Sequence, residues 1–301
     1  MRLTYQLIAR TGILDRVDPA LYHRSGADGD APVSVRYLGT AGFVLSCGHH
    51  TIVLDPYVSR PGGRETLFAP LVPDAERIAR LLPVADDVLI GHAHHDHVLD
   101  APELCRQTGA RFIGSVDACN VARAAGLPAG QIVETAGRED IPTASGFVRG
   151  LPSAHGRVYF NRVGLPGTID TPPPWPPRVS DLRHGLVLNW LVEMAGVRVV
   201  HIDTAELFEH ELHGVECDVL CLCAIGRAYR PGYTEDAIRL LKPRVVIPCH
   251  WDLFTTPIED EPFLLPGVDL PGFVDEIRAT GTEVAVLPFL GTMGVGGPDG
   301  Q

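Results

Sequence analysis

The sequence lacks any run of about 18 consecutive apolar residues, the length that a membrane-spanning helix needs. It also lacks a recognisable leader, because the apolar part of residues 1–10 is too short for a secretory signal peptide. The seven cysteines are an odd number and do not follow the spacing of a disulfide framework. These absences predict a cytoplasmic protein without a membrane span, whose cysteines are reduced thiols.

Positive charge is scarce: 25 Lys and Arg residues face 37 Asp and Glu residues, which gives a formal net charge of −12. A chain this acidic repels phosphate backbones, which argues against a nucleic-acid-coating protein and against an RNA-processing nuclease. The Gly-x-Ser-x-Gly pattern of a serine nucleophile elbow is also missing. We therefore expect a small-molecule substrate and no nucleic-acid partner. The sequence leaves the oligomeric state open, a homo-oligomer included.

The composition is that of a globular protein, with 301 residues of which 45% are hydrophobic and 21% charged. Strand-like and helix-like segments are interspersed from about residue 33 onward, which predicts an α/β or α+β sandwich of about one domain. The expected division is an N-terminal extension over residues 1–31, one domain over 32–291 and a flexible tail over 292–301. Within the domain, the proline-rich stretch 164–178 is expected to form a surface loop or lid.

A histidine-rich run, His-Ala-His-His-Asp-His at residues 92–97, follows a short segment that is typical of a buried strand. Side chains two residues apart in an extended chain point the same way, so His92 and His94 can reach one metal ion from one side. Asp96 and His97 come where the chain turns toward a helix, and they can face a second ion. Imidazoles with a carboxylate are ligands for a borderline or hard divalent cation.

Three further candidate ligands, His155, Asp203 and His250, lie at the ends of later predicted strands. Strand ends that meet at one edge of a sandwich are where a shared site is assembled, so we expect these side chains to join the histidine run. The simpler alternative is a polar loop that happens to be rich in histidine. The three additional ligands argue against that alternative.

Together these features resemble the metallo-β-lactamase superfamily, and within it the branch of L-ascorbate 6-phosphate lactonase and related metal-dependent hydrolases. The resemblance extends from about Val33 to Gly291. Besides the ligands, it includes Tyr37-Leu38-Gly39-Thr40-Ala41-Gly42 and Leu54-Asp55-Pro56. It implies a four-layer αββα sandwich with a dinuclear metal site at one edge.

The resemblance also implies how the ligands are shared. His92, His94 and His155 would hold the first ion, Asp96, His97 and His250 the second, and Asp203 would bridge both. Asp55 would accept a hydrogen bond from a ligand histidine and so fix its orientation. The cofactor would be two divalent ions, with zinc first and manganese or iron as alternatives, since such ligand sets accept all three.

The implied activity is metal-dependent hydrolysis, in which a hydroxide that bridges the two ions attacks a lactone, ester, amide or phosphodiester. Asp96 is a candidate proton acceptor beside the ions. Tyr229 is a candidate hydrogen-bond donor to a developing oxyanion. Two other functions remain open: an iron-dependent redox enzyme of the same fold, and a non-catalytic binding module that a metal stabilises.

Candidates for substrate binding come from a loop that borders the site in this fold. Arg227 and Arg230 are candidates for holding an anionic group. Tyr233 is a further hydrogen-bonding candidate, and Trp251 follows a ligand directly and is expected to line the pocket. The alternatives are a solvated loop without ligand contacts and, for Trp251, packing in the core.

Overall fold

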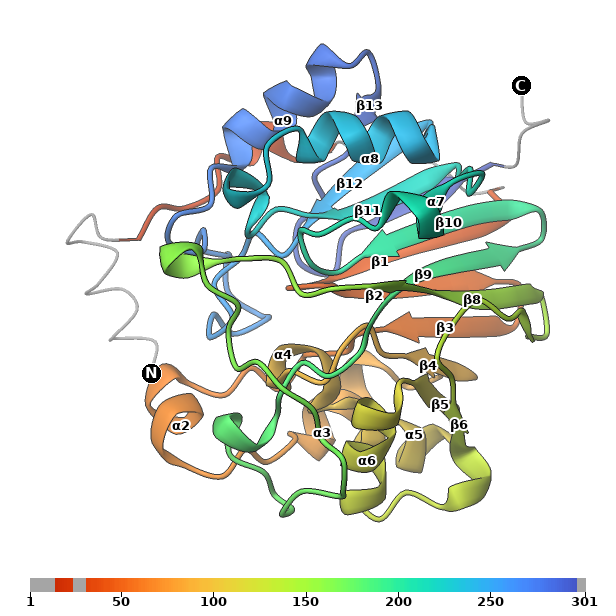
Figure 1. The fold of residues 1–301 in the computed structure, drawn as a ribbon, viewed down its shortest axis with the longest axis vertical. Helices are drawn as coiled ribbons and strands as arrows, with labels where there is room; N and C mark the ends of the chain where they lie inside the picture. The colour runs from red at the N-terminus through yellow and green to blue at the C-terminus, as the bar shows by residue number, and fades with distance from the viewer. Residues whose placement is uncertain (1–13, 24–30, 297–301) are drawn as a thin grey trace.

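The structure, a computed structural model, describes residues 14–23 and 31–296. Two seven-stranded sheets lie face to face between two layers of helices (Figure 1). This arrangement is the αββα sandwich that the sequence predicts. Within the described residues, no helix has both the length and the apolar character that crossing a membrane requires.

The first sheet combines an antiparallel half with a parallel half. From β1 to β3 and from β14 to β1 the neighbours are antiparallel, and from β3 to β6 they are parallel. In spatial order its strands are β14 (Thr292–Val295), β1 (Val33–Gly39), β2 (Gly42–Cys47), β3 (His50–Leu54), β4 (Asp87–Leu89), β5 (Arg111–Gly114) and β6 (Ile132–Glu134).

The second sheet is built in the same way. Its parallel half runs from β10 to β13, and β7 to β10 are antiparallel neighbours, so β8, β10 and β12 all end at one edge. In spatial order its strands are β13 (Glu283–Val284), β12 (Val245–Cys249), β11 (Val219–Cys223), β10 (Val197–Ile202), β9 (Val187–Met194), β8 (Gly146–Ser153) and β7 (Ile141–Pro142).

Each sheet is covered on its outer face by helices, whose ends carry local signals. Side chains of Asp74, Ser115 and Asp269 accept hydrogen bonds from the first turns of α3, α6 and α9. The helices of the first sheet are α2 (Gly63–Phe68), α3 (Ala75–Leu81), α4 (His95–Val98), α5 (Ala101–Thr108) and α6 (Val116–Ala124). Those of the second are α7 (Glu209–Leu212), α8 (Tyr233–Leu241) and α9 (Leu270–Ala279) (Figure 1).

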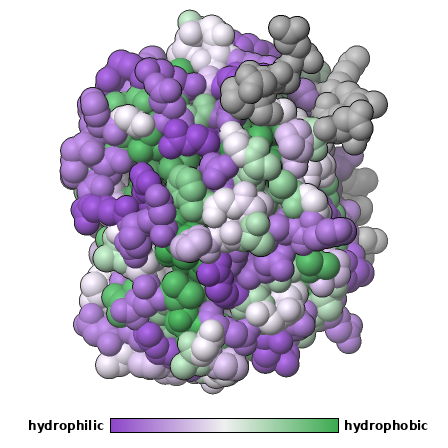
Figure 2. All heavy atoms as spheres, turned by 90° about the vertical axis from the view of Figure 1, so that its right-hand side faces the viewer, coloured by the Kyte–Doolittle hydropathy of each residue, from purple (hydrophilic) through white to green (hydrophobic). Residues whose placement is uncertain are grey.

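The apolar side chains form two separate cores. One lies between the sheets and under α8 and α9, and it includes Tyr37, Trp190 and Phe273. The other lies between the first sheet and helices α3 to α6, and it includes Ile78 and Phe112. None of the seven cysteines is in a disulfide. The face at the right of Figure 1 mixes hydrophilic and hydrophobic residues around a narrow hydrophobic band (Figure 2).

The chain ends differ in part from the expected division into extension, domain and tail. Thr292–Val295 are not a flexible tail but form β14, which pairs with β1 and completes the first sheet. Residues 14–23 pack on the domain, with Val17 buried. Short bridges join Arg16 to Phe263 and Tyr22 to Val286. Residues 1–13, 24–30 and 297–301, which belong to the expected extension and tail, lie outside the described residues.

Candidate metal centre

The histidine run begins three residues after β4 ends, at the edge where the parallel strands terminate. His94 has an extended backbone and α4 starts at His95, so the chain turns within the motif as the sequence predicts. Gly91 lets the chain approach the second sheet closely. A Cβ at this position would lie 2.1 Å from Asp203 Oδ2 and 3.0 Å from Asp55 Oδ2.

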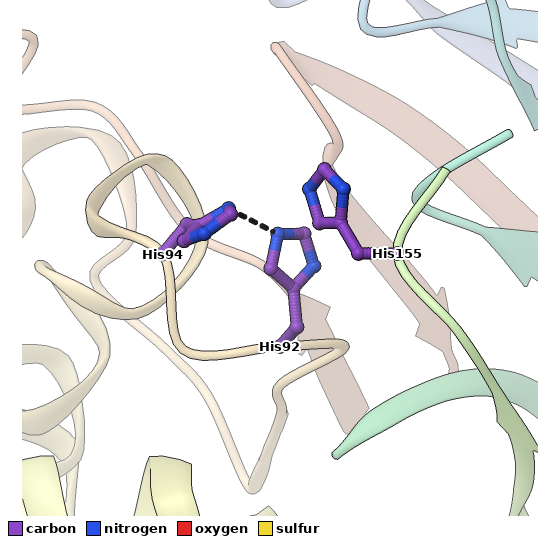
Figure 3. A group of neighbouring side chains, drawn as sticks. All are labelled: His92, His94 and His155. Carbon is purple, nitrogen blue, oxygen red and sulfur yellow. Dashed lines mark hydrogen bonds between the residues drawn. The ribbon is translucent and has the colours of Figure 1, made fainter. Parts of the chain in front are cut away.

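His92, His94 and His155 form the first group of candidate ligands. Figure 3 shows the three imidazoles converging, with His155 reaching in from the opposite segment of chain. His92 Nε2 lies 3.0 Å from His94 Nδ1. The ring centre of His155 lies 4.9 Å from that of His92 and 4.8 Å from that of His94. One ligand atom from each residue lies within 4.8 Å of the others, which is the spacing of a single metal site.

Asp96, His97 and His250 form the second group. His250 Nε2 lies 3.2 Å from His97 Nε2 and 3.3 Å from Asp96 Oδ2. His250 follows β12 with a left-handed backbone, at a φ of 56°, and its N–H donates to the Thr40 carbonyl at 2.6 Å. That bond ties the end of β12 to the turn between β1 and β2, and so fixes where this imidazole points.

Asp203 joins the two groups. Its Oδ2 lies 2.6 Å from His92 Nδ1 and 3.7 Å from His97 Nδ1. Its Oδ1 is buried and has no hydrogen-bond partner among the described residues. Asp55 lies behind His97, with its Oδ2 2.9 Å from His97 Nδ1. The structure therefore brings together all seven residues proposed from the sequence, with Asp55 behind them.

The electrostatics of this cluster suit bound cations. Burial lowers the pKa of His92 and His97 well below the ordinary value and that of His94 to about 3, so these rings are neutral and have lone pairs to offer. Burial and the neighbouring Asp203 raise the pKa of Asp55 well above its usual range. The buried carboxylates of Asp55 and Asp203 repel each other when both are ionised, and divalent ions beside them would offset this repulsion.

The two candidate arginines are paired with carboxylates of the chain. Arg227 donates to the Asp269 carbonyl at 3.0 Å and lies 3.4 Å from Glu276 Oε1. Arg230 lies 3.1 Å from both Glu206 and Asp236. Both guanidinium groups are thus engaged by carboxylates, while Arg227 Nε is buried without a hydrogen-bond partner, and their role in holding a substrate anion stays a prediction.

The aromatic candidates differ from one another in burial. Trp251 is fully buried, donates its indole N–H to the Pro248 carbonyl and stacks on Phe289, so it is a core residue and not a wall of the pocket. Tyr233 is the first residue of α8 and is buried in the core that extends under this helix. Tyr229 is 42% exposed and lines a pocket with Tyr159 and other residues, none of which belongs to the two ligand groups.

One residue beside the centre has no signal in the sequence. The His184 ring centre lies 5.6 Å from that of His155 and 5.9 Å from that of His94. His184 comes just before β9, at the end of the segment that begins with the proline-rich stretch. A lone histidine without motif spacing could not be assigned to the site before the fold was known.

Known proteins resemble this chain in both sequence and fold. The Beta-lactamase superfamily domain matches residues 34–250. A UPF0173 metal-dependent hydrolase of Thermococcus onnurineus is 30% identical over 239 residues, which cover 76% of this chain and 89% of that protein.

Two solved structures share the fold at lower identity. Igni18, a metallo hydrolase of Ignicoccus hospitalis, has a TM-score of 0.57 and 21% identity over 87% of this chain and 97% of its own. CmlA, a diiron β-hydroxylase of Streptomyces venezuelae, has a TM-score of 0.56 and 16% identity over 88% and 54%. The narrower likeness to the ascorbate 6-phosphate lactonase branch stays a prediction. The domain match, the sandwich and the ligand cluster at its edge together identify the chain as a member of the metallo-β-lactamase superfamily.

Proposed function

We propose that this protein is a hydrolase that depends on two divalent metal ions. The observation that carries the proposal is that seven buried or half-buried side chains form three overlapping groups of candidate ligands, of which the middle group, His92, His97 and Asp203, links the other two. His92, His94 and His155 would hold one ion. Asp96, His97 and His250 would hold the other, and Asp203 would contact both. Zinc is the first choice of metal, with manganese and iron as alternatives.

The ions would supply the electrophilic chemistry: when bound, they lower the pKa of a water molecule and polarise the carbonyl or phosphoryl group whose carbon or phosphorus is attacked. The chain's own residues keep the site in place. Asp55 fixes the ring of His97, and the Thr40 carbonyl fixes the backbone of His250. Asp96 is the candidate proton acceptor. Burial acts to raise its pKa, but His97, His250 and His95 outweigh burial and hold the pKa well below the usual range. The carboxylate is therefore ionised near neutral pH.

The substrate is proposed to be a small molecule with a lactone, ester, amide or phosphodiester bond. Because Arg227 and Arg230 are paired with carboxylates, an anionic group on the substrate would be bound mainly by the metal ions. Tyr229 remains a candidate oxyanion donor only for a substrate long enough to reach its pocket.

The proposal is tested by hydrolysis of a panel of aryl phosphodiester, aryl ester and lactone substrates by zinc- or manganese-loaded protein. We expect turnover of at least one class. We expect that turnover to be lost on chelation and to fall by several orders of magnitude in His155→Ala and Asp203→Ala. Exposed His213 offers a matched control, since His213→Ala removes an imidazole from the surface. Full turnover in the two site variants would refute the proposal.

The likeness to CmlA keeps a second function in view, because that neighbour is a diiron enzyme. The same His and Asp donors accept iron. Purified protein that carries iron and consumes oxygen, but hydrolyses no substrate of the panel, would favour redox chemistry over hydrolysis. Bound metal without turnover of either kind would favour a non-catalytic binding module.

A further inference from the structure

The proline-rich stretch 164–178 is a mostly exposed loop without helix or strand, as expected, and it is held against α6. Asp117, buried in the first turn of α6, accepts hydrogen bonds from the backbone of Ile169 at 2.7 Å and of Leu186 at 3.0 Å. Asn120, one turn later, donates to the Ile169 carbonyl at 2.7 Å. One buried carboxylate and one amide therefore fix both arms of the segment 164–186.

The two arms are also joined to each other where they meet. The N–H of Gly185 donates to the Gly167 carbonyl at 3.0 Å, and Arg183 Nη1 donates to the Pro166 carbonyl at 2.8 Å. Gly185 has a φ of +64°, and a Cβ there would lie 2.1 Å from the Asp117 carboxyl carbon. We call residues 165–167 and 183–186, where the two arms meet, the neck of the segment. The neck packs tightly on Asp117, and this packing fixes the position of His184, the residue before Gly185.

This neck touches the histidine run directly. The N–H of Ala93 donates to the His184 carbonyl at 3.0 Å. On the opposite arm, the Leu165 carbonyl lies 3.4 Å from His94 Nε2. His94 faces His92 through Nδ1, so Nε2 is the nitrogen that is free to donate to this carbonyl. The segment therefore orients one of the candidate ligands, as carbonyl groups commonly do for metal-binding histidines.

The side chain of His184 lies over the outer side of the first ligand group. Its ring is at 31° to that of His155 and nearly perpendicular to that of His94. His155 and His184 are both only partly buried, whereas His92 and His94 are buried, so the first two mark the open side of the centre. The ring nitrogens of His184 belong to none of the ligand groups found among the described residues.

The hydrogen bond within the neck sets the chemistry that His184 offers. Its Nδ1 lies 2.6 Å from the Gly185 carbonyl, which can only accept, so Nδ1 carries the proton. In the neutral ring, Nε2 is then a hydrogen-bond acceptor. We propose that segment 164–186 is a fixed wall of the metal centre and that its His184 accepts a hydrogen bond from an N–H or O–H group of the bound substrate. This inference rests on the proposed function. It narrows the class of substrates to molecules that carry an N–H or O–H group beside the bond that is hydrolysed.

Binding of acetohydroxamic acid to cobalt-loaded protein tests the inference without any turnover. This probe chelates metal ions through two oxygens and carries an N–H beside them. We expect His184→Ala to weaken its binding about three- to tenfold, the loss of one hydrogen bond. The number of bound cobalt ions and the visible absorption spectrum of the probe-free protein should not change. His184→Gln, which keeps a polar acceptor, should recover part of the affinity, and His213→Ala should behave as wild type.

Each outcome separates this inference from the proposed function. Wild-type protein that binds no cobalt would overturn the proposed metal centre itself. If cobalt binds and His184→Ala leaves the affinity for the probe unchanged, the contact does not exist. A lower cobalt stoichiometry in His184→Ala would make His184 a ligand and would likewise overturn the inference. Asp117→Ala should also weaken binding of the probe. Combining Asp117→Ala with His184→Ala should weaken binding little more than His184→Ala alone, because Asp117 acts on the probe by positioning His184.

Discussion

Asp55 Oδ2 lies 2.9 Å from His97 Nδ1, and the Oδ1 of the same carboxylate accepts a hydrogen bond from the Gly91 backbone at 2.7 Å. One side chain at the end of β3 therefore sets both the ring of a candidate ligand and the start of the histidine run. Asp55 has a φ of +42°, a left-handed conformation that is uncommon for a residue with a side chain. The backbone accepts this conformation at the point where the carboxylate faces the metal centre.

Asp55→Asn is predicted to weaken metal binding. The amide can still accept from Gly91, but it cannot take the place of a carboxylate behind the His97 ring. Loss of such a partner typically costs 10- to 100-fold in metal affinity. Competition with a chromophoric chelator measures the change. Asp86→Asn is the matched control, since exposed Asp86 also accepts a backbone hydrogen bond, from Thr51. Equal metal affinity in Asp55→Asn and wild type would contradict the role of Asp55.

Gly91→Ala is predicted to abolish tight binding of metal ions at the candidate metal centre. The new Cβ would overlap Asp203 Oδ2 at 2.1 Å, so the carboxylate that joins the two groups must move. Metal content after dialysis measures the effect, and circular dichroism checks that the fold is kept. Gly63→Ala is the control, because a Cβ at Gly63 meets no atom within 4 Å. A variant that keeps wild-type metal content would show that Asp203 is not needed at its present position.

The grouping of the candidate ligands could be predicted from the sequence because each one follows a strand and the strands share an edge. His155, Asp203 and His250 follow the ends of β8, β10 and β12 by one or two residues. Asp55 was likewise predictable, since it lies in a recognisable Leu-Asp-Pro element. The order of the expected strands predicts the direction in which each one runs. Strands that run in the same direction end at the same edge of a sheet, and this brings the side chains that follow them together.

The residues around the ligands could not be predicted, because their positions depend on contacts between segments far apart in the sequence. The charges of Arg227 and Arg230 suggested anion binding, but their neighbours Glu276 and Glu206 lie 49 and 24 residues away. His184 lies near His155 only because Asp117 fixes the neck of segment 164–186. Thr292–Val295 were expected to belong to a flexible tail, because four residues are too few to show the alternation of a strand. In the structure they pair with β1.

The buried ion pair between Arg60 and Asp252 is predicted to be essential for stability. Arg60 Nη2 lies 2.6 Å from Asp252 Oδ2, and both side chains are fully buried. Asp252 Oδ1 accepts from the Tyr37 hydroxyl at 2.6 Å and from the Thr40 N–H at 2.7 Å. Asp252→Ala would leave the guanidinium unpaired, which costs about 3–5 kcal/mol.

Urea unfolding of metal-free protein measures this loss. Glu134→Ala provides the control, because its partner Arg123 is 2.8 Å away but the two side chains are 45% and 40% exposed. Exposed pairs contribute about 0–1 kcal/mol, so the control should lie near wild type. Since the Thr40 carbonyl also accepts from the N–H of His250, Asp252→Ala should lower metal affinity as well. Unfolding curves for the two variants that coincide would refute the prediction.

Asp100 is predicted to make the protein less stable as the pH rises toward neutrality. Burial raises the pKa of Asp100 from 3.8 to about 6, despite hydrogen bonds from the backbone of Val58 and Ser59. A carboxyl whose pKa is higher in the folded state stabilises the fold below pH 3.8, and this contribution is lost as the pH passes 6. Asp100→Asn cannot ionise and keeps an acceptor for both N–H groups. The variant should therefore gain about 2 kcal/mol relative to wild type between pH 4 and pH 7. Urea unfolding of both metal-free proteins across this range measures the difference. A difference that does not change with pH would mean that Asp100 is already ionised in the folded state at pH 4, because its two backbone hydrogen bonds outweigh burial.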